Sequence, residues 1–205
     1  QSLTVGGDNS STEFSGVVSG TGGLAKQGTG TLTLSGANSY SGATTINAGA
    51  LSISGSLSDG TAVNVGGSGT YELGADDTVG SIAGSGAINL GDQSLTVGGD
   101  NSSTEFSGVV SGAGALTKTG GGQLSLSGAN AYTGSTSINN GTLLVSGSLS
   151  DGTAVNVGGS GTYEVGADDT VGSIAGSGAI NLGDQSLTVG GDNSSTEFSG
   201  VVSGA

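Results

Sequence analysis

The side chains that could carry chemistry in this sequence are carboxylates, hydroxyls and two lysines. His and Cys are absent from all 205 residues, which excludes imidazole bases, the usual catalytic triads and thiolate metal sites. The best enzymatic arrangement left is a carboxylate pair acting on polysaccharide, and the adjacent pairs are Asp76 with Asp77 and Asp168 with Asp169. Both pairs recur with a long repeat, whereas catalytic groups are normally unique. We therefore predict solvated turns rather than an enzyme.

A second possible chemistry is weak calcium binding by acidic loops. The segment GGDNSSTE occurs three times and is rich in the oxygen ligands that calcium prefers. Its spacing differs from that of the glycine-rich nonapeptide of calcium-binding β-rolls, so an Asx-type turn is the preferred interpretation. No other cofactor is expected. The candidate calcium ligands are Asp8, Glu13, Asp76, Asp77, Asp100, Glu105, Asp168 and Asp169.

A long internal repeat determines where these residues lie. The segment QSLTVGGDNSSTEFSGVVSG begins at positions 1, 93 and 185, which gives a period of 92 residues. The chain therefore divides into a unit at 1-92, a unit at 93-184 and the start of a third at 185-205. Since no change in composition separates them, we predict one continuous solenoid.

A shorter period of strand cores lies within each unit. The cores TLTL, ALSI, TYEL, AINL, TEFS and QLSL begin at positions 31, 50, 70, 87, 104 and 123. Steps of this size suit one coil of a β-solenoid, in which each coil buries its inner face only against its neighbours. The predicted fold class is all-β, a right-handed parallel β-helix with about five coils per 92-residue unit, or four longer ones.

The differences between the two complete units reveal which side chains point inward. The units differ at 16 positions, and between 21 and 45 every difference falls on an odd number. A period of two is typical of a strand whose side chains alternate between two faces. The unchanged set, which this pattern predicts to point inward, includes Leu24, Leu32, Tyr40 and Ile46. Lys26 shares this phase, and because a buried ammonium is costly, we expect a bend near Gly28 to turn it outward.

The remaining polar and aromatic residues also recur in register. Asn38, Asn64 and their copies could contact a ligand or could stabilise bends and stacked coils, and the structural role is favoured. The four Tyr and three Phe are expected in the core because they do not gather in one patch.

Composition limits the class of partner. There is no Pro among 205 residues, so every residue can donate to a strand ladder. The net charge of -14, with only Lys26 and Lys118 as cations, argues against nucleic acid and anionic lipid as partners. No apolar run approaches the ~20 residues of a membrane span, so no membrane insertion of this segment is expected. Gln1 does not begin a signal peptide, and we expect the chain to be part of a longer protein.

The segment from Gly114 to Gly147, with its counterpart from Gly23 to Gly55, carries a specific pattern. It has the spacing G-x-L-x-K-x-G-x-G-x-L-x-L-x-G-x-N-x-Y-x-G-x-T followed by N-x-G-x-L. This pattern resembles the autotransporter-associated β-strand repeat, also called the passenger-associated transport repeat, of Gram-negative autotransporter passenger proteins. The resemblance implies an exported passenger β-helix in which the repeat assists secretion and folding rather than catalysis.

The expected function is therefore a structural stalk or fibre module of an adhesin-like surface protein, located outside the bacterial cell. Expected partners are other copies of the chain, associating end to end through exposed coil edges, and a ligand on a host cell, matrix or neighbouring cell. The alternatives are a polysaccharide-binding or polysaccharide-active β-helix and a calcium-binding surface repeat.

Overall fold

The computed structural model describes residues 1–204, and it is built from β-strands, turns and loops. No helix long and apolar enough to cross a membrane occurs in this part of the chain. The strands are β1 (Ser2–Val5), β2 (Thr12–Phe14), β3 (Gly23–Lys26), β4 (Thr31–Leu34), β5 (Thr44–Ile53), β6 (Ala62–Leu73), β7 (Asp77–Val79), β8 (Ser81–Gly84), β9 (Ala87–Asn89), β10 (Leu95–Val97), β11 (Thr104–Phe106), β12 (Val109–Ser111), β13 (Leu116–Lys118), β14 (Gln123–Leu126), β15 (Thr136–Val145), β16 (Ala154–Val165), β17 (Asp169–Val171), β18 (Ser173–Gly176), β19 (Ala179–Asn181), β20 (Leu187–Val189) and β21 (Val201–Ser203).

The strands form parallel ladders on three sides of a rod. The first side contains β1, β3, the first halves of β5 and β6, β8, β11, β14, the second halves of β15 and β16, β19 and β21. The second contains β2, β4, the second halves of β5 and β6, β9 and β12, with β17 and β20 near the far end. The third contains β7, β10, β13, the first halves of β15 and β16, and β18.

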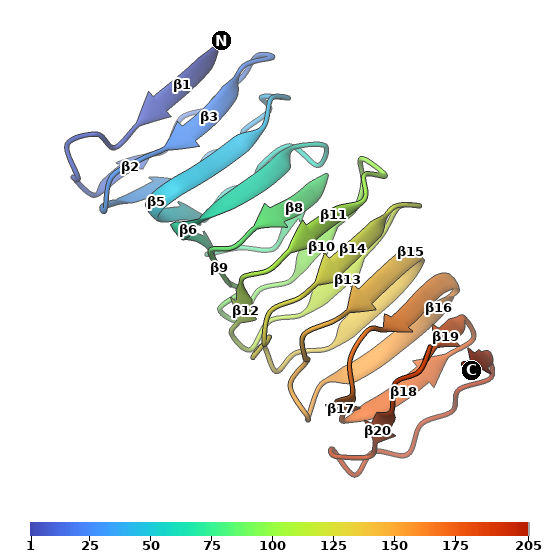
Figure 1. Cartoon of the computed structure of the whole chain (residues 1–205). Coiled ribbons are helices and arrows are strands. Elements are labelled where there is room, and N and C mark those ends of the chain that lie inside the picture. The colour runs from blue at the N-terminus through green and yellow to red at the C-terminus, as the bar shows by residue number, and fades with distance from the viewer. Residues whose placement is uncertain (205) are drawn as a thin grey trace.

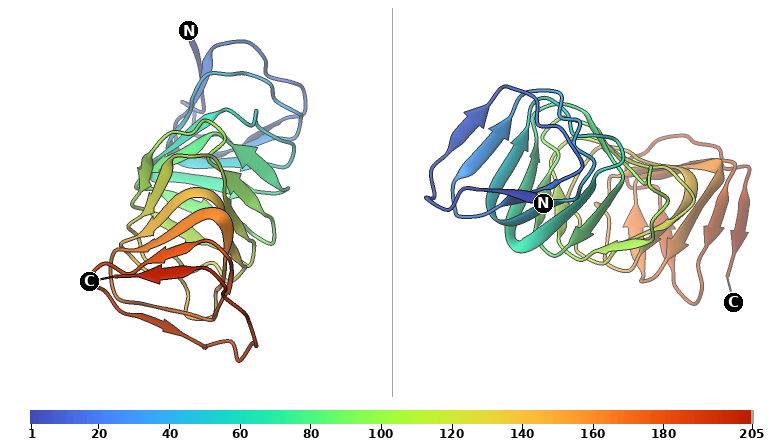
Figure 2. Two further views of the ribbon diagram at one scale, coloured as in Figure 1. Left: turned by 90° about the vertical axis from the view of Figure 1, so that its right-hand side faces the viewer. Right: turned by 90° about the horizontal axis from the view of Figure 1, so that it is seen from above.

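The chain winds into a parallel β-solenoid of about ten turns, with its two termini at opposite ends of the rod (Figures 1 and 2). Strands facing the viewer in Figure 1 run toward the lower left while the chain advances toward the lower right, so the coil is right-handed. This is the hand that connections between parallel strands favour. The predicted fold class is therefore confirmed.

The core is a column of inward-facing aliphatic and aromatic side chains. The alternation in β4 is representative, because Leu32 and Leu34 are buried and the threonines between them are only partly so. Tyr40, Tyr71, Tyr132 and Tyr163 are all buried, as predicted. The expected inward set is confirmed as well, and between β4 and β5 stacking puts Leu32 beside Leu51 and Leu34 beside Ile53.

Glycine makes the corners possible where coils lie in close contact. Gly28 has φ of 67°, and a Cβ there would lie 2.0 Å from the carbonyl oxygen of Gly6 in the preceding coil. Gly49 repeats this conformation one coil further on, with φ of 65°. Only glycine reaches this left-handed region without steric cost, so these corners can stack directly on one another.

The 92-residue unit does not contain a whole number of coils. Leu24 lies in β3 on the first side, whereas its copy Leu116 lies in β13 on the third. Each unit therefore fills about four and two-thirds coils and is turned by one side of the rod relative to the unit before it. This agrees with about five coils, but the expected alignment of the core at 104 over the core at 87 is wrong. Ala87 pairs with Val109, and Phe106 pairs with Gly84.

Candidate functional site

The adjacent acids Asp76 and Asp77 do not form a pair. Asp77 begins β7 and points into the core, where it is only 5 % exposed. Its carboxylate accepts hydrogen bonds from the Tyr71 hydroxyl (2.6 Å) and the Leu57 backbone N–H (3.1 Å). Asp76 faces solvent and accepts a bond from the Ser94 backbone N–H (2.7 Å). The solvated-turn interpretation was therefore wrong for Asp77, because strand alternation puts neighbouring side chains on opposite faces.

The second pair follows the same pattern. Asp169 is buried and accepts a hydrogen bond from the Leu149 N–H (3.1 Å), while Asp168 accepts one from the Ser186 N–H (2.8 Å). Burial raises the pKa of both Asp77 and Asp169, with their hydrogen bonds acting in the opposite direction. In the described residues the Tyr163 hydroxyl has no hydrogen-bond partner, unlike its copy in the first unit. These carboxylates hold loops to the core.

The GGDNSSTE segments fold as Asx turns, as preferred from the sequence. The Asp8 carboxylate accepts a hydrogen bond from the Ser10 N–H (3.1 Å), and Asp100 accepts one from the Ser102 N–H (2.9 Å). Asp100 also receives the Ser81 hydroxyl from the preceding coil (2.7 Å). The loop at Asp100 therefore joins its own coil to the coil before it, whereas the loop at Asp8, in the first coil, has no such bond.

The two glutamates of these segments are used in the same way. Glu13 accepts a hydrogen bond from the Ser35 hydroxyl and Glu105 one from the Ser127 hydroxyl, each at 2.7 Å. Across residues 1–204 no three acidic side chains come together as a group able to hold a metal. Calcium binding stays a prediction, with these carboxylates occupied by serine and backbone donors.

Lys26 is inside the solenoid, contrary to the expected outward bend. Its side chain is 1 % exposed, and the ammonium donates to the backbone carbonyls of Gln27 (2.6 Å), Gly28 (2.8 Å) and Ala48 (3.2 Å). The corner at Gly28 points these carbonyls inward instead of turning the lysine out. The ammonium thus satisfies acceptors from two successive coils.

Lys118 repeats this arrangement in the second unit. It donates to the carbonyls of Thr119, Gly120 (2.9 Å) and Asn140 (3.4 Å). Desolvation lowers the pKa of both lysines. The sequence signal was already present, because each lysine shares the phase of the leucines before it, but the inward carbonyls of the corner were not foreseeable from residue types alone.

Asn38 clamps three successive coils together, which confirms its predicted structural role. Its side-chain carbonyl accepts the Val18 N–H (3.0 Å) from the preceding coil, and its amide donates to Gly36 (2.8 Å) and to Ser56 (3.1 Å) in the next coil. Asn130 makes the same set of bonds in the second unit. Asn64, by contrast, faces solvent.

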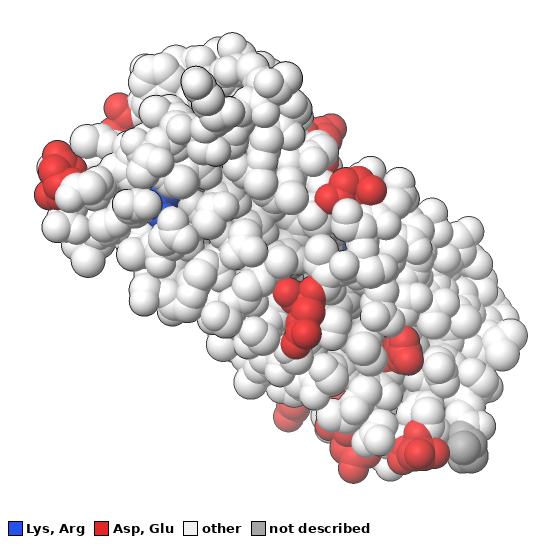
Figure 3. All heavy atoms as spheres, turned by 45° about the horizontal axis from the view of Figure 1, so that its top comes forward, with Lys and Arg blue, Asp and Glu red and all other residues white. Residues whose placement is uncertain are grey.

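The outer surface carries negative charge without basic side chains to balance it. Both lysines of the chain are buried, so the exposed charged side chains of residues 1–204 are Asp and Glu. In Figure 3 the acidic groups form separate patches along the rod, and lysine atoms are visible only in small recesses. Such a surface repels other acidic surfaces at low ionic strength.

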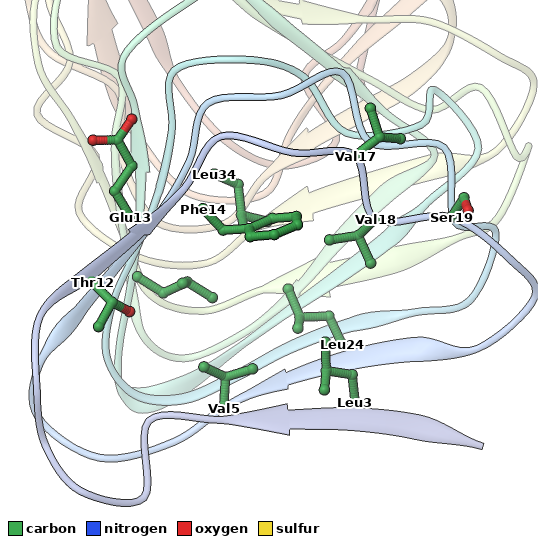
Figure 4. A pocket seen from close by; sticks show the side chains of 11 residues that line it. Leu3, Val5, Thr12, Glu13, Phe14, Val17, Val18, Ser19, Leu24 and Leu34 are labelled. Carbon is green, nitrogen blue, oxygen red and sulfur yellow. The ribbon is translucent and has the colours of Figure 1, made fainter.

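A hollow lies at the end of the rod that holds the first coil. It has a volume of about 600 Å³ and is lined by apolar side chains of the first two coils, among them Leu3, Phe14, Val17 and Leu24. Figure 4 shows Leu3, Phe14 and Leu24 pointing into the same space, whereas Val17 points away from it. Leu3 is 52 % exposed and Phe14 is 47 % exposed, whereas their copies Leu95 and Phe106 are fully buried. The hollow is thus the uncovered end of the core.

Two segments of the chain match a known family. The passenger-associated-transport-repeat family matches residues 24–53 and 116–145, which run from β3 into β5 and from β13 into β15. The chain contains two passenger-associated-transport-repeats. Each of these repeats includes the buried lysine, the asparagine clamp and the stacked glycine corner described above.

One curated protein similar to this chain is named as an autotransporter. The chain is 36 % identical over 149 residues to the adhesin BmaC autotransporter of Brucella suis, and the match covers 67 % of this chain. The match spans about 4 % of that relative's length. No solved structure is similar enough to match.

The passenger-associated-transport-repeats and the β-solenoid support a structural role for this chain within a passenger. Membership of a passenger family implies a protein that is surface-exposed or secreted. The polar groups singled out from the sequence act within this framework by joining coils, and the same bonds recur in each unit.

Proposed function

We propose that this chain is a non-catalytic stalk segment of an adhesin at the bacterial cell surface, where it extends the protein away from the cell. The supporting observation is the equivalence of the two units. The lysine corner and the asparagine clamp each have a copy one unit away with the equivalent partners, and the Asp100 turn has a copy at Asp8 with the equivalent bond to the serine two residues on. A stalk gains length from such repetition.

The geometry also favours a stiff rod. Strands of successive coils lie ~4.8 Å apart, so about ten turns give a rod of roughly 50 Å. Each coil is bonded to its neighbours through backbone ladders and through side chains such as Asn38, which spans three coils. A rod of this type keeps its direction as units are added.

The adhesive role is proposed from the relative's name. The distribution of charge on the surface suggests what kind of contact a ligand would make. The exposed charges of the described residues are acidic and recur on successive sides of the rod. A ligand on a host cell, matrix or neighbouring cell would then meet several weak, equivalent contacts rather than one deep site, and their avidity would depend on unit number.

The test has two arms. Electron microscopy of the purified chain should show straight rods of uniform width, and incubation with a panel of acidic and neutral polysaccharides should release no reducing ends. Globular particles would contradict the stalk, and turnover that is lost on Asp76→Asn substitution would instead support the polysaccharide-active alternative. Binding of labelled chain to host-cell matrix, abolished by salt, would support the multivalent adhesive role.

A further inference from the structure

The second unit carries a reactive dipeptide at a corner where the first unit does not. Asn140 and Gly141 form the one Asn-Gly pair in the 205-residue sequence, and the first unit has Ala48 and Gly49 in their place. The two corners share one backbone conformation, since φ is 67° at Gly141 and 65° at Gly49. Asparagine is a chemically labile residue, and glycine, which has no side chain, leaves its backbone nitrogen unshielded. The corner is thus a candidate for deamidation, and the first unit holds an unreactive copy of it.

The Asn140 side chain lies against the nitrogen that would attack it. Asn140 is exposed, and its side-chain carbonyl oxygen accepts a hydrogen bond from the Gly141 N–H (2.8 Å). This bond closes a small ring that contains both atoms that must join, the Gly141 nitrogen and the side-chain carbon of Asn140. Holding the reacting groups together in this way removes much of the entropy loss that the reaction would otherwise require.

The buried Lys118 ammonium contacts the peptide group that supplies this nitrogen. It donates to the Asn140 backbone carbonyl (3.4 Å), which belongs to the same peptide bond as the Gly141 N–H. A positive charge at the oxygen draws electron density from the nitrogen, so the proton is removed more easily and the attacking anion is stabilised. In the first unit Lys26 donates to the Ala48 carbonyl (3.2 Å) in the same way, but alanine offers no amide to attack.

The corner that contains Asn140 is one residue shorter than the corners stacked on either side of it. Ile138 and Thr142, which flank it in β15, are four residues apart. Their register partners are five residues apart in both neighbouring coils, and these partners are Lys118 and Gln123 before it and Val157 and Thr162 after it. An isoaspartyl linkage runs the backbone through the side-chain carbon and adds one bond. It would therefore lengthen this corner toward the length of its neighbours.

We propose that Asn140 converts to isoaspartate in the folded rod with the assistance of Lys118. The Gly141 nitrogen bonds to the side-chain carbon of Asn140, its proton passes through water to the departing amide nitrogen, and ammonia leaves a cyclic succinimide. Water then cleaves the bond between the Gly141 nitrogen and the former backbone carbonyl carbon of Asn140. The products are a free α-carboxyl group and a chain that continues through the side-chain carbon, and no oxidant or reductant is needed.

Lys118 favours this product over ordinary aspartate. The ammonium polarises the carbonyl that water attacks, and the carboxylate released there replaces a neutral oxygen beside a buried cation. The other acceptors of this lysine are the backbone carbonyls of Thr119 and Gly120, so the new carboxylate supplies its first charged partner. Hydrolysis on the other side of the succinimide would give aspartate and leave the ammonium with neutral acceptors.

The reaction in the folded chain should be compared with that in the unfolded chain. Freshly purified chain is incubated at neutral pH in sodium chloride, where it is folded, and at the same ionic strength in guanidinium chloride, where it is unfolded. Enzymatic methylation of the free carboxyl measures isoaspartate, and peptide mass spectrometry assigns it to position 140. We expect the folded chain to react roughly tenfold faster, because the ammonium and the folded-back side chain act only there.

Matched variants separate the roles of the asparagine and the lysine. Asn140→Ala introduces the residue of the first unit and should form no isoaspartate at this corner. Ala48→Asn should create a second site, where Lys26 takes the part of Lys118. Lys118→Met, checked for folding by circular dichroism, should react roughly tenfold more slowly, the effect of one lost charge-assisted hydrogen bond. Its ratio of isoaspartate to aspartate should also fall to that of the unfolded natural chain.

Several results would contradict the proposal. Asn140 that stays intact in the folded chain, or that reacts there no faster than in the unfolded chain, would overturn it. A folded Lys118→Met chain with the natural rate and product ratio would remove the role of the ammonium. If that variant does not fold, an unmodified corner in folded Ala48→Asn chain would overturn the proposal instead. Since no assay involves a ligand or the shape of the rod, failure here leaves the proposed stalk role intact.

Discussion

Leu24 and Leu116 occupy equivalent positions in consecutive units, yet they lie on different sides of the rod. Leu24 stacks between Leu3 and Thr44 on the first side, and Leu116 stacks between Leu95 and Thr136 on the third. The local contacts are the same, and only the orientation about the axis differs. A surface feature that occurs once per unit therefore appears on a different side of the rod in each of three successive units. Only a fourth unit would present it on the starting side again.

The register at the junction of the two units can be tested with paired cysteines. Ala87 and Val109 are partners in adjacent strands, and both side chains point outward. We expect the A87C/V109C chain to form a disulfide within one molecule under mild oxidation. The A87C/T104C chain should remain reduced, since Thr104 belongs to the ladder on another side. Intact-mass spectrometry after alkylation of free thiols distinguishes the two, because only the reduced chain gains two alkyl groups, and the reverse result would restore the simple five-coil alignment.

Replacing the buried lysine should destabilise the rod. In Lys118→Met the apolar stem is retained, but the carbonyls of Gly120 and Asn140 lose their donor. Leaving buried acceptors unpaired costs about 2 kcal/mol, partly offset because the charge no longer has to be desolvated. Guanidinium unfolding followed by circular dichroism measures this change. Thr117→Met on the outer face is the control, and equal midpoints for the two variants would contradict a structural role for the ammonium.

The raised pKa values of Asp77 and Asp169 predict a pH effect of definite sign. Because burial raises the pKa of each carboxyl above its usual 3.8, the native state takes up protons before the unfolded state does. Their contribution to stability therefore increases as pH falls from the raised native pKa toward about 3.8. The free energy of unfolding of the natural chain should rise relative to D77N/D169N across this window.

An opposite slope is expected at Asp8, which provides the control for that experiment. Hydrogen bonds from the Ser10 backbone and hydroxyl lower the pKa of the Asp8 carboxyl. Its contribution is present above about 3.8 and is lost as pH falls through the lowered native pKa. The natural chain should thus lose stability relative to Asp8→Asn on acidification. Parallel slopes for the two comparisons would mean that general charge repulsion, not these particular groups, controls the response.

Much of the fold can be predicted from the sequence because the same strand pattern recurs many times along the chain. The inward positions Leu32 and Leu34 are given by the period of two, and the parallel solenoid by the repeated strand cores. The number of residues per coil was harder to predict. Steps between partners vary from 17, for Thr70 and Ala87, to 22, for Ala87 and Val109, so the spacing of similar motifs alone gives the wrong partner at the junction.

The polar interior was the part least accessible to sequence reasoning. Lys26 and Asp77 are types that usually stay in water, and only the geometry of the surrounding corners supplies the carbonyls, N–H groups and hydroxyl that make burial tolerable. The phase of Lys26 is the correct signal, whereas its residue type points to the opposite and wrong expectation of exposure. In a solenoid, inward backbone groups at corners should be considered before a buried charge is rejected.

The acidic turns should matter for joining coils rather than for binding calcium. Asp100 links its own Asx turn at Ser102 to Ser81 in the preceding coil, whereas Asp8 bonds only to Ser10. Asp100→Ala should therefore lower the free energy of unfolding by about 1 kcal/mol, the usual value for a lost hydrogen bond. Asp8→Ala should have a smaller effect. We expect ~5 mM calcium, above the dissociation constants of about 0.1 to 1 mM that are typical of weak extracellular sites, to leave the unfolding midpoints of all three chains unchanged. A calcium-dependent rise in the natural chain that disappears in Asp100→Ala would instead make this loop a metal site.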